Sequence, residues 1–127
     1  MGTLRALADT SLFIGLEQGR ISSIRHSLTL SMITIGELRL GVLNAADPAA
    51  RAARLRTLQS ALALDPLPVD DQVADAWAEL RVALRAAGRR LDLNDAWIAA
   101  TAIAHGLPLV TQDRDYRDVP GLDVVAL

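Results

Sequence analysis

The stretch LNDAWIAATAIAHGLPLVTQDRDY, residues 93–116, decides the fold of this 127-residue chain. Its first half is rich in alanine, which favours a short helix. The Gly-Leu-Pro sequence that follows ends that helix, and the apolar residues up to Thr111 have the length of a buried strand. Asp95 lies in the first turn of the predicted helix, and Asp113 lies just past the end of the predicted strand. A helix followed closely by a short buried strand is typical of α/β folds with a parallel sheet.

The rest of the chain repeats this alternation of short strands and helices. The sequence predicts strands at residues 4–8, 28–31 and 123–127, an edge or irregular strand at 67–69, and helices at 12–18, 32–42, 49–64 and 70–87. There is no repeat, no low-complexity linker and no composition shift. We therefore expect a single domain over residues 1–127, with a short, mostly parallel sheet between two layers of helices.

Two of these helices carry local predictions that the structure can test. Thr10 and Ser11 are good N-cap residues for the helix at 12–18. In the helix at 49–64, the apolar stripe is expected to run through Leu55, Leu58 and Leu62.

Composition excludes several classes of site. The chain has no cysteine, which rules out disulfides and thiolate metal sites and favours a reducing compartment. His26 and His105 are its only histidines, too few for a histidine-rich zinc site. No signal peptide is apparent, and no apolar run reaches the roughly 20 residues of a membrane helix, so a cytoplasmic protein without membrane contact is expected.

All 13 basic residues are arginine, and several of them are clustered. The clusters are Arg51, Arg54 and Arg56, then Arg81, Arg85, Arg89 and Arg90. Arginine matches phosphate geometry better than lysine does, although a solvated helix face would also explain each cluster. The net charge of −2 does not by itself indicate a nucleic-acid binder, and with 3% aromatic residues, recognition of RNA shape is favoured over base stacking.

Four acids are predicted to converge at one edge of the sheet. Asp9 and Asp113 follow predicted strands, whereas Glu37 and Asp95 lie near the starts of helices that follow strands. In parallel α/β sheets, the carboxyl ends of the strands form the ligand-binding edge. Each acid also has a purely structural alternative. Asp9 could cap a helix, Glu37 could form a capping box with Thr34, Asp95 could favour a helix dipole and Asp113 could form a turn.

The four acids together indicate a cation site. Carboxylates that meet without a cation repel one another and raise one another's pKa values. Oxygen ligands suit Mg²⁺ or Mn²⁺, and such a site can activate a water and stabilise the leaving oxygen of a phosphodiester. Ser11 and Thr111 are candidate hydroxyls for orienting a carboxylate, and Asp115 could share the role of Asp113.

The whole chain resembles the PIN-domain family and, within it, the VapC-type toxins of bacterial toxin–antitoxin pairs. The resemblance is carried by the order and spacing of LADTS (7–11), SMITIGELRLGV (31–42), LNDAWIAATAIAHGLPLVTQDRDY (93–116) and VPGLDVV (119–125). It implies a PIN-like three-layer fold and a Mg²⁺-dependent endoribonuclease acting on structured RNA such as transfer or ribosomal RNA. It also implies a homodimer, held by a VapB-type antitoxin whose tail covers the active site.

The resemblance further implies roles for individual residues. The catalytic acids of the family fall on Asp9, Glu37, Asp95 and Asp113, of which Asp9, Asp95 and Asp113 would hold the metal. The main alternative is a PIN-like module that binds RNA or protein without cutting. A response-regulator-like domain would need a lysine, which the chain lacks, and a Toprim-type site built on Asp113 and Asp115 would need a glutamate after the first strand.

Overall fold

The computed structural model describes residues 5–22 and 24–127. The strands are β1 (Arg5–Ala8), β2 (Ser27–Leu30), β3 (Leu109–Thr111) and β4 (Val124–Ala126). The helices are α1 (Thr10–Glu17), α2 (Met32–Leu43), α3 (Pro48–Leu62), α4 (Asp71–Ala86) and α5 (Leu93–Ala104), and η1 (Arg114–Tyr116) is a single 3-10 turn. These elements confirm the predicted alternation of strands and helices. Leu4, the predicted start of the first strand, lies outside the described residues.

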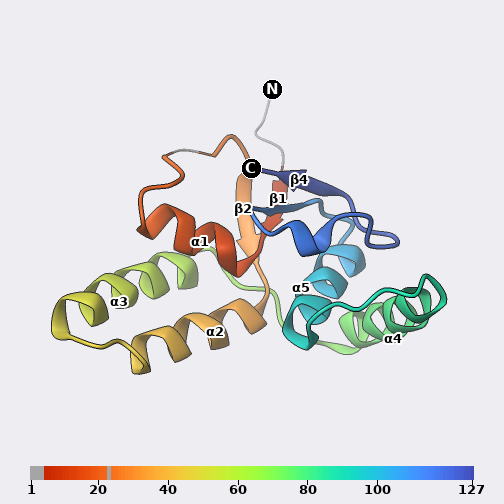
Figure 1. Cartoon of the computed structure of the whole chain (residues 1–127), viewed down its shortest axis with the longest axis horizontal. Helices are drawn as coiled ribbons and strands as arrows, with labels where there is room; N and C mark the ends of the chain where they lie inside the picture. The colour runs from red at the N-terminus through yellow and green to blue at the C-terminus, as the bar shows by residue number, and fades with distance from the viewer. Residues whose placement is uncertain (1–4, 23) are drawn as a thin grey trace.

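The four strands form one parallel sheet in the order β2-β1-β3-β4 (Figure 1). Leu7 of β1 pairs with Thr29 of β2 on one side and with Leu109 of β3 on the other. The first strand of the chain therefore lies inside the sheet, beside a strand from near the other end of the sequence. The parallel sheet predicted from the sequence is confirmed.

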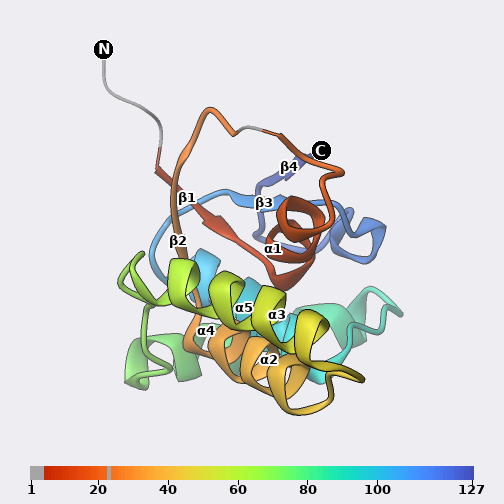
Figure 2. The same ribbon diagram turned by 90° about the vertical axis from the view of Figure 1, so that its left-hand side faces the viewer.

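Side chains of β1 alternate between two hydrophobic cores, one on each face of the sheet. Leu7 packs in the core that contains Leu80 of α4. Ala6 and Ala8 pack in the other core, with Leu58 of α3. Figures 1 and 2 show the result, in which α1, α2 and α3 cover one face of the sheet while α4 and α5 cover the other. The predicted arrangement in three layers is therefore confirmed.

The α4–α5 layer contains the two tryptophans. Trp77 of α4 and Trp97 of α5 stack with ring centroids 4.6 Å apart and an interplanar angle of 8°. Both are half-buried, and Trp77 packs against the core that includes Leu80 and Leu84. From the sequence, Trp77, Leu80 and Leu84 are expected to form the core face of the helix at 70–87, and their packing in α4 confirms this.

The apolar stripe predicted for α3 is wrong for two of its three residues, because tertiary contacts decide which side of the helix is buried. In α3, Leu55 and Leu62 are 43% and 38% exposed, and the buried residues are Leu58 and Ala61. The contacts of α3 with α1 and α2 fix its buried side along Leu58 and Ala61. Leu58 is buried as predicted, whereas Ala61 lies on the buried side in place of Leu55 and Leu62.

The segment predicted as a strand at residues 67–69 makes a single parallel bridge, between Ser31 and Leu67. The amide of Leu67 donates to the carbonyl of Leu30 at 2.7 Å, and its carbonyl accepts from the amide of Met32 at 2.9 Å. Pro68 has no N–H to continue the ladder. Within the described part of the chain, no helix is both long and apolar enough to cross a membrane.

Candidate metal centre

Asp9 stands at the carboxyl end of the central strand β1 and is almost completely buried. It is also the N-cap of α1, since its Oδ1 accepts a hydrogen bond from the amide of Leu12 at 3.3 Å. The prediction that Thr10 or Ser11 caps this helix is therefore wrong, because the helix begins at Thr10. Capping and a role in the site, which the sequence left as alternatives, are compatible in one side chain, since a carboxylate has two oxygens.

Two hydroxyls fix the carboxylate of Asp9. Ser11 Oγ lies 2.8 Å from Oδ1 and 3.0 Å from Oδ2, and Thr111 Oγ1 donates to Oδ2 at 2.7 Å. Ser11 and Thr111 thus orient a carboxylate, as the sequence predicted. Burial raises the pKa of Asp9, the bonds from Thr111, Ser11 and the Leu12 amide lower it, and the charge of Asp113 raises it, so that the net shift is upward.

Thr111 joins the ends of two neighbouring strands. Its hydroxyl donates to Asp9 after β1 and accepts from the amide of Asp113 after β3, at 2.8 Å. The amide of Gln112 also donates to Ser11 Oγ, at 3.2 Å. These bonds hold the residues that follow β1 and β3 at one edge of the sheet.

Glu37 lies in the middle of α2 and points towards α1. Thr10 Oγ1 donates to Glu37 Oε1 at 2.6 Å and also lies 3.1 Å from Thr34 Oγ1. The cap of α2 is Ser31, whose hydroxyl accepts from the amide of Ile33 at 3.1 Å. The capping-box alternative for Thr34 and Glu37 is therefore wrong, because the helix starts three residues too early for it.

Asp95 lies in the first turn of α5, and its partner is Tyr116. The phenolic hydroxyl of Tyr116 donates to Asp95 Oδ1 at 2.9 Å, and the tyrosine side chain is fully buried. The pKa of Asp95 is raised to about 6. Burial is the largest cause; the bond from Tyr116 lowers the pKa, and the charges of Asp113, Asp92 and Glu37 raise it. Burial and the charges of Asp95, Asp9 and Asp113 raise the pKa of Tyr116, which therefore stays a protonated donor.

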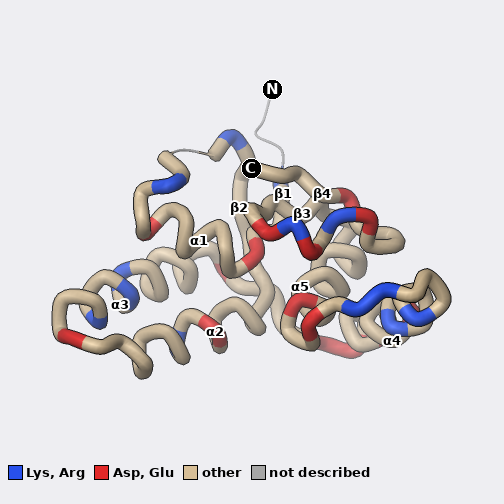
Figure 3. The backbone as a smooth tube through the Cα atoms, viewed as in Figure 1, with Lys and Arg blue, Asp and Glu red and all other residues tan. Residues whose placement is uncertain are grey.

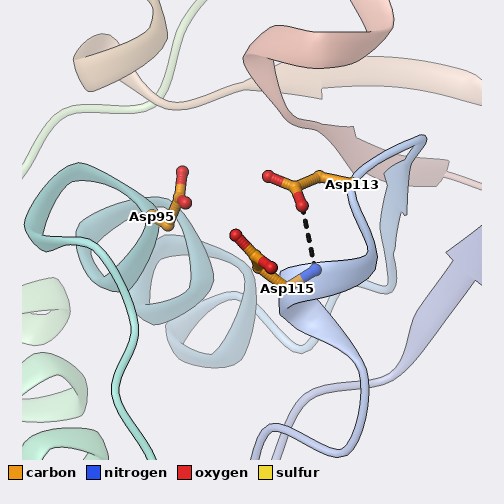
Figure 4. A group of neighbouring side chains, drawn as sticks. All are labelled: Asp95, Asp113 and Asp115. Atoms are coloured by element: carbon orange, nitrogen blue, oxygen red, sulfur yellow. Dashed lines mark hydrogen bonds between the residues drawn. The ribbon is translucent and has the colours of Figure 1, made fainter.

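Asp113 and Asp115 flank the start of η1. Asp113 Oδ1 accepts from the amide of Asp115 at 2.9 Å and caps the 3-10 turn. The 3-10 turn η1 directs both carboxylates towards Asp95, as Figure 4 shows. One oxygen from each of Asp95, Asp113 and Asp115 lies within 4.8 Å of the others. We refer to these three residues as the acid cluster.

The acid cluster differs from the predicted ligand set. It contains Asp115, which the sequence left as an open alternative, and it contains neither Asp9 nor Glu37. Hydrogen bonds from Ser11 and Thr111 hold the carboxylate of Asp9. Both acids nevertheless lie near the cluster, since the charge of Asp113 acts on Asp9 and the charge of Glu37 acts on Asp95.

Sequence reasoning missed two residues of the site. Thr10 positions Glu37, and Tyr116 positions Asp95. The only sequence signal for Tyr116 was its place three residues after Asp113, at the end of an acidic run. Thr10 gave no signal of its own beyond following Asp9.

The donor set fits a hard divalent cation. The cluster supplies carboxylate oxygens only, which suit Mg²⁺ and Mn²⁺ and not a soft metal. Neighbouring negative charge and burial disfavour the ionised form of Asp95. A cation among these oxygens would reverse that effect, because it favours the charged form.

Comparison with known proteins agrees with this geometry. The sequence model of the PIN-domain family matches residues 6–122. The chain is 49% identical over 130 residues to ribonuclease VapC4 of Mycobacterium tuberculosis strain H37Rv, with all of both chains covered. It is 46% identical over 116 residues to ribonuclease VapC5 of the same strain, covering 89% of this chain and 86% of the relative.

A solved structure has the same fold. A member of the VapBC family of toxin–antitoxin systems, VapBC-5 of Mycobacterium tuberculosis, superposes with a TM-score of 0.83 at 39% identity, covering 97% of this chain and 98% of that one. The matches with the family model, with VapC4 and with the VapBC-5 structure each extend over nearly the whole chain. The chain therefore belongs to the PIN-domain family, in the group of the VapC ribonucleases.

Proposed function

We propose that the chain is a Mg²⁺-dependent endoribonuclease, for which Mn²⁺ can substitute, and that it is the toxin of a toxin–antitoxin pair. The observation that carries this proposal is the acid cluster of Asp95, Asp113 and Asp115 beside the buried Asp9. Three oxygen donors within 4.8 Å make a site for a divalent cation, and membership in the VapC group supports RNA as the substrate.

The proposed ligands are Asp9, Asp95 and Asp113, with Asp115 as a further oxygen donor at the same place. When bound, Mg²⁺ would supply activation of water and stabilisation of the charge on the leaving oxygen of a phosphodiester. Thr111 and Ser11 hold the carboxylate of Asp9 in one orientation, and Tyr116 does the same for Asp95. Fixed ligands reduce the reorganisation needed in the transition state.

Glu37 is proposed to orient the attacking water, and it is the fourth catalytic acid. Its Oε1 accepts from Thr10, so the second oxygen is the one proposed to accept a hydrogen bond from the water. Hydrolysis adds that water to phosphorus and breaks one P–O bond of the RNA backbone. Structured RNA, such as transfer or ribosomal RNA, is the proposed substrate class.

The proposed partner is a VapB-type antitoxin, and the proposed assembly is a homodimer in the cytoplasm. Support for the antitoxin partner comes from the similar chain in the VapBC-5 structure, which is described as a member of a family of toxin–antitoxin systems. A related FitAcB structure from Neisseria gonorrhoeae, 30% identical with a TM-score of 0.75, has the same fold.

Cleavage assays with defined metals test the proposal. Total transfer RNA and ribosomal RNA would be incubated with the chain in Mg²⁺, in Mn²⁺ or in EDTA. We expect cleavage with either metal and none in EDTA. Asp9→Asn and Asp95→Asn should each reduce the cleavage rate by about 100-fold or more while the circular dichroism spectrum stays unchanged, because the loss of a charged ligand affects the transition state directly.

Asp118→Asn is the matched control, since it removes the same charge close to the site. Asp118 is exposed and has a left-handed φ of 57°, which asparagine also tolerates, so this variant should cleave like the parent. If the parent cuts no RNA at any enzyme or Mg²⁺ concentration, the chain is a non-catalytic PIN-like binding module instead.

A further inference from the structure

A hollow lined by arginine lies at the C-terminal end of α4, outside the acid cluster. Its volume is about 550 Å³. The lining residues, which we call the arginine hollow, are Arg81, Leu84, Arg85, Gly88, Arg89, Arg90 and Leu91. Four of these seven residues are arginine and none is acidic, although the whole chain has a net charge of −2. The sequence had left this cluster with two interpretations, a solvated helix face or a surface that attracts RNA.

Arg89 connects the arginine hollow with the acid cluster. Its guanidinium donates to the backbone carbonyl of Arg117 and, at 3.1 Å, to the carbonyl of Asp115. Asp115 belongs to the acid cluster, so a hydrogen bond from Arg89 links the arginine hollow to the backbone of the candidate metal centre. Figure 3 shows the same relation, with basic segments of α4 and of the loop after it lying beside the acidic start of α5.

Arg81 is held in place by the tryptophan pair. Its guanidinium carbon lies 5.6 Å from the centre of the Trp77 ring, which itself stacks on Trp97. At this distance the charge of Arg81 is attracted by the ring, an interaction that uses none of the N–H donors that would bind an anion.

The helix dipole explains only part of the clustering of arginine at the C-terminal end of α4. Arg85 lies in the last turn of α4, where a positive charge is favourable. The helix end carries about half an elementary charge, far less than four guanidinium groups bring. Like charges that surround one hollow repel each other unless an anion lies among them.

We propose that the arginine hollow binds backbone phosphates of the RNA substrate beside the acid cluster. This inference depends on the proposed nuclease function, because it assigns a binding surface to the same substrate. Guanidinium groups pair with phosphate in bidentate geometry, and an RNA strand with one phosphodiester at the acid cluster carries further phosphates on either side. Arg89, tied to the Asp115 backbone, lies between the two surfaces.

Binding in the absence of metal tests this directly. The affinity of fluorescein-labelled total bacterial transfer RNA would be measured by fluorescence anisotropy in EDTA over a range of salt concentrations. Arg85→Gln/Arg90→Gln should weaken binding about tenfold and lower the slope of log Kd against log salt by about 1.4 to 1.8, because each lost phosphate contact removes about 0.7 to 0.9. Arg85→Lys/Arg90→Lys, which keeps both charges, should retain most of the parent slope.

The matched control is Arg51→Gln/Arg56→Gln, which removes the same charge from exposed positions of α3, in the opposite helical layer. It should change Kd by less than about twofold. Equal losses in both double variants would overturn the inference, since they would indicate a diffuse charge effect. The arginine hollow would also be excluded as an RNA site if Arg85→Gln/Arg90→Gln bound RNA like the parent. The same conclusion would hold if this variant bound RNA normally but lost affinity for the antitoxin.

The outcome is separate from that of the cleavage assay. A parent that cuts RNA with Mg²⁺ while the hollow variants bind normally would support the nuclease and overturn the hollow. A hollow-specific loss of RNA binding in a chain that cuts no RNA would show that the arginine hollow binds RNA and would overturn the nuclease, and with it the assignment of this RNA as a substrate.

Discussion

Asp95 shows how one side chain links the site to the stability of the fold. Its pKa is raised from an ordinary 3.8 to about 6, first by burial and then by neighbouring carboxylates. The folded state therefore holds this proton more tightly than the unfolded state between pH 4 and pH 6. Stability then falls as pH rises through that window, and above pH 6 the loss is constant.

The residue-scale prediction compares Asp95→Asn with the parent in EDTA. We expect the variant to be more stable by about 1 kcal/mol above pH 6.5, a figure reduced for the partial exposure of Asp95, because asparagine carries no charge and can still accept from Tyr116. Urea unfolding at pH 4 and pH 7.5 measures the difference, which should vanish near pH 4. A difference that is the same at both pH values would show that Asp95 does not carry this cost.

At the same scale, the sequence predicted the hydroxyls that orient a carboxylate, Ser11 and Thr111, but not the partners of Glu37 and Asp95. Asp9 and Asp113 could be placed at one edge because both follow strands of a parallel sheet. The bonds from Thr10 to Glu37 and from Tyr116 to Asp95 join residues 27 and 21 positions apart. No local pattern encodes such a pair, since it depends on how two elements pack. Asp115 stayed undecided because the 3-10 turn that directs it towards Asp95 is set by backbone geometry.

At the scale of elements, helix α1 must lie close to the loop after β3 for Asp9 and Asp113 to be near each other. Gly15 makes this possible, because a Cβ at this position would lie 2.6 Å from Gln112 Oε1 and 2.9 Å from Ile21 Cδ1. Gly36, in α2, has nothing within 4 Å of such a Cβ. The two glycines therefore have different structural roles, although both lie in helices.

Alanine substitutions separate these roles. Gly36→Ala should raise the free energy of unfolding by about 0.5 to 1 kcal/mol, because alanine loses less backbone entropy in a helix. Gly15→Ala should give no gain, since Gln112 and Ile21 must move aside. Urea denaturation of both variants at one pH measures this. An equal gain from both would mean that α1 does not approach the loop as closely as the structure indicates.

The ends of most elements could be predicted from caps and breaks, such as Gly88 after α4 and Asp65-Pro66 after α3. The exposure of Leu55 and Leu62 could not be predicted, because hydrophobic periodicity indicates an apolar side of a helix but not which element packs against it. The start of α1 was also missed, because Asp, Ser and Thr are all good caps and only the fold selects Asp9.

At the scale of the whole molecule, the acid cluster implies coupling between metal binding and global stability. A cation that binds only the folded state stabilises it by about 1.4 kcal/mol at ten times its Kd. For a chain of this size we expect the melting temperature to rise by about 3 to 6 °C on saturation with Mg²⁺.

Thermal unfolding of the parent, Asp118→Asn and Asp115→Asn tests this coupling. Each protein is measured with and without 10 mM Mg²⁺, a trial concentration taken as about ten times Kd. The parent and Asp118→Asn should show the full shift. Asp115→Asn should show a smaller one, since it removes one of the three clustered carboxylates. A full shift in Asp115→Asn would exclude Asp115 from the metal site.

The order of the sheet also has a consequence for synthesis on the ribosome. β1 is made first, yet its neighbour β3 and the Thr111 hydroxyl that holds Asp9 come from the last fifth of the chain. At about 5 to 20 residues per second, several seconds separate the two. Until the final segment leaves the exit tunnel, Asp9 has no Thr111 and Asp95 has no Tyr116. The candidate metal centre therefore cannot assemble until β3 and the residues that follow it have joined the sheet.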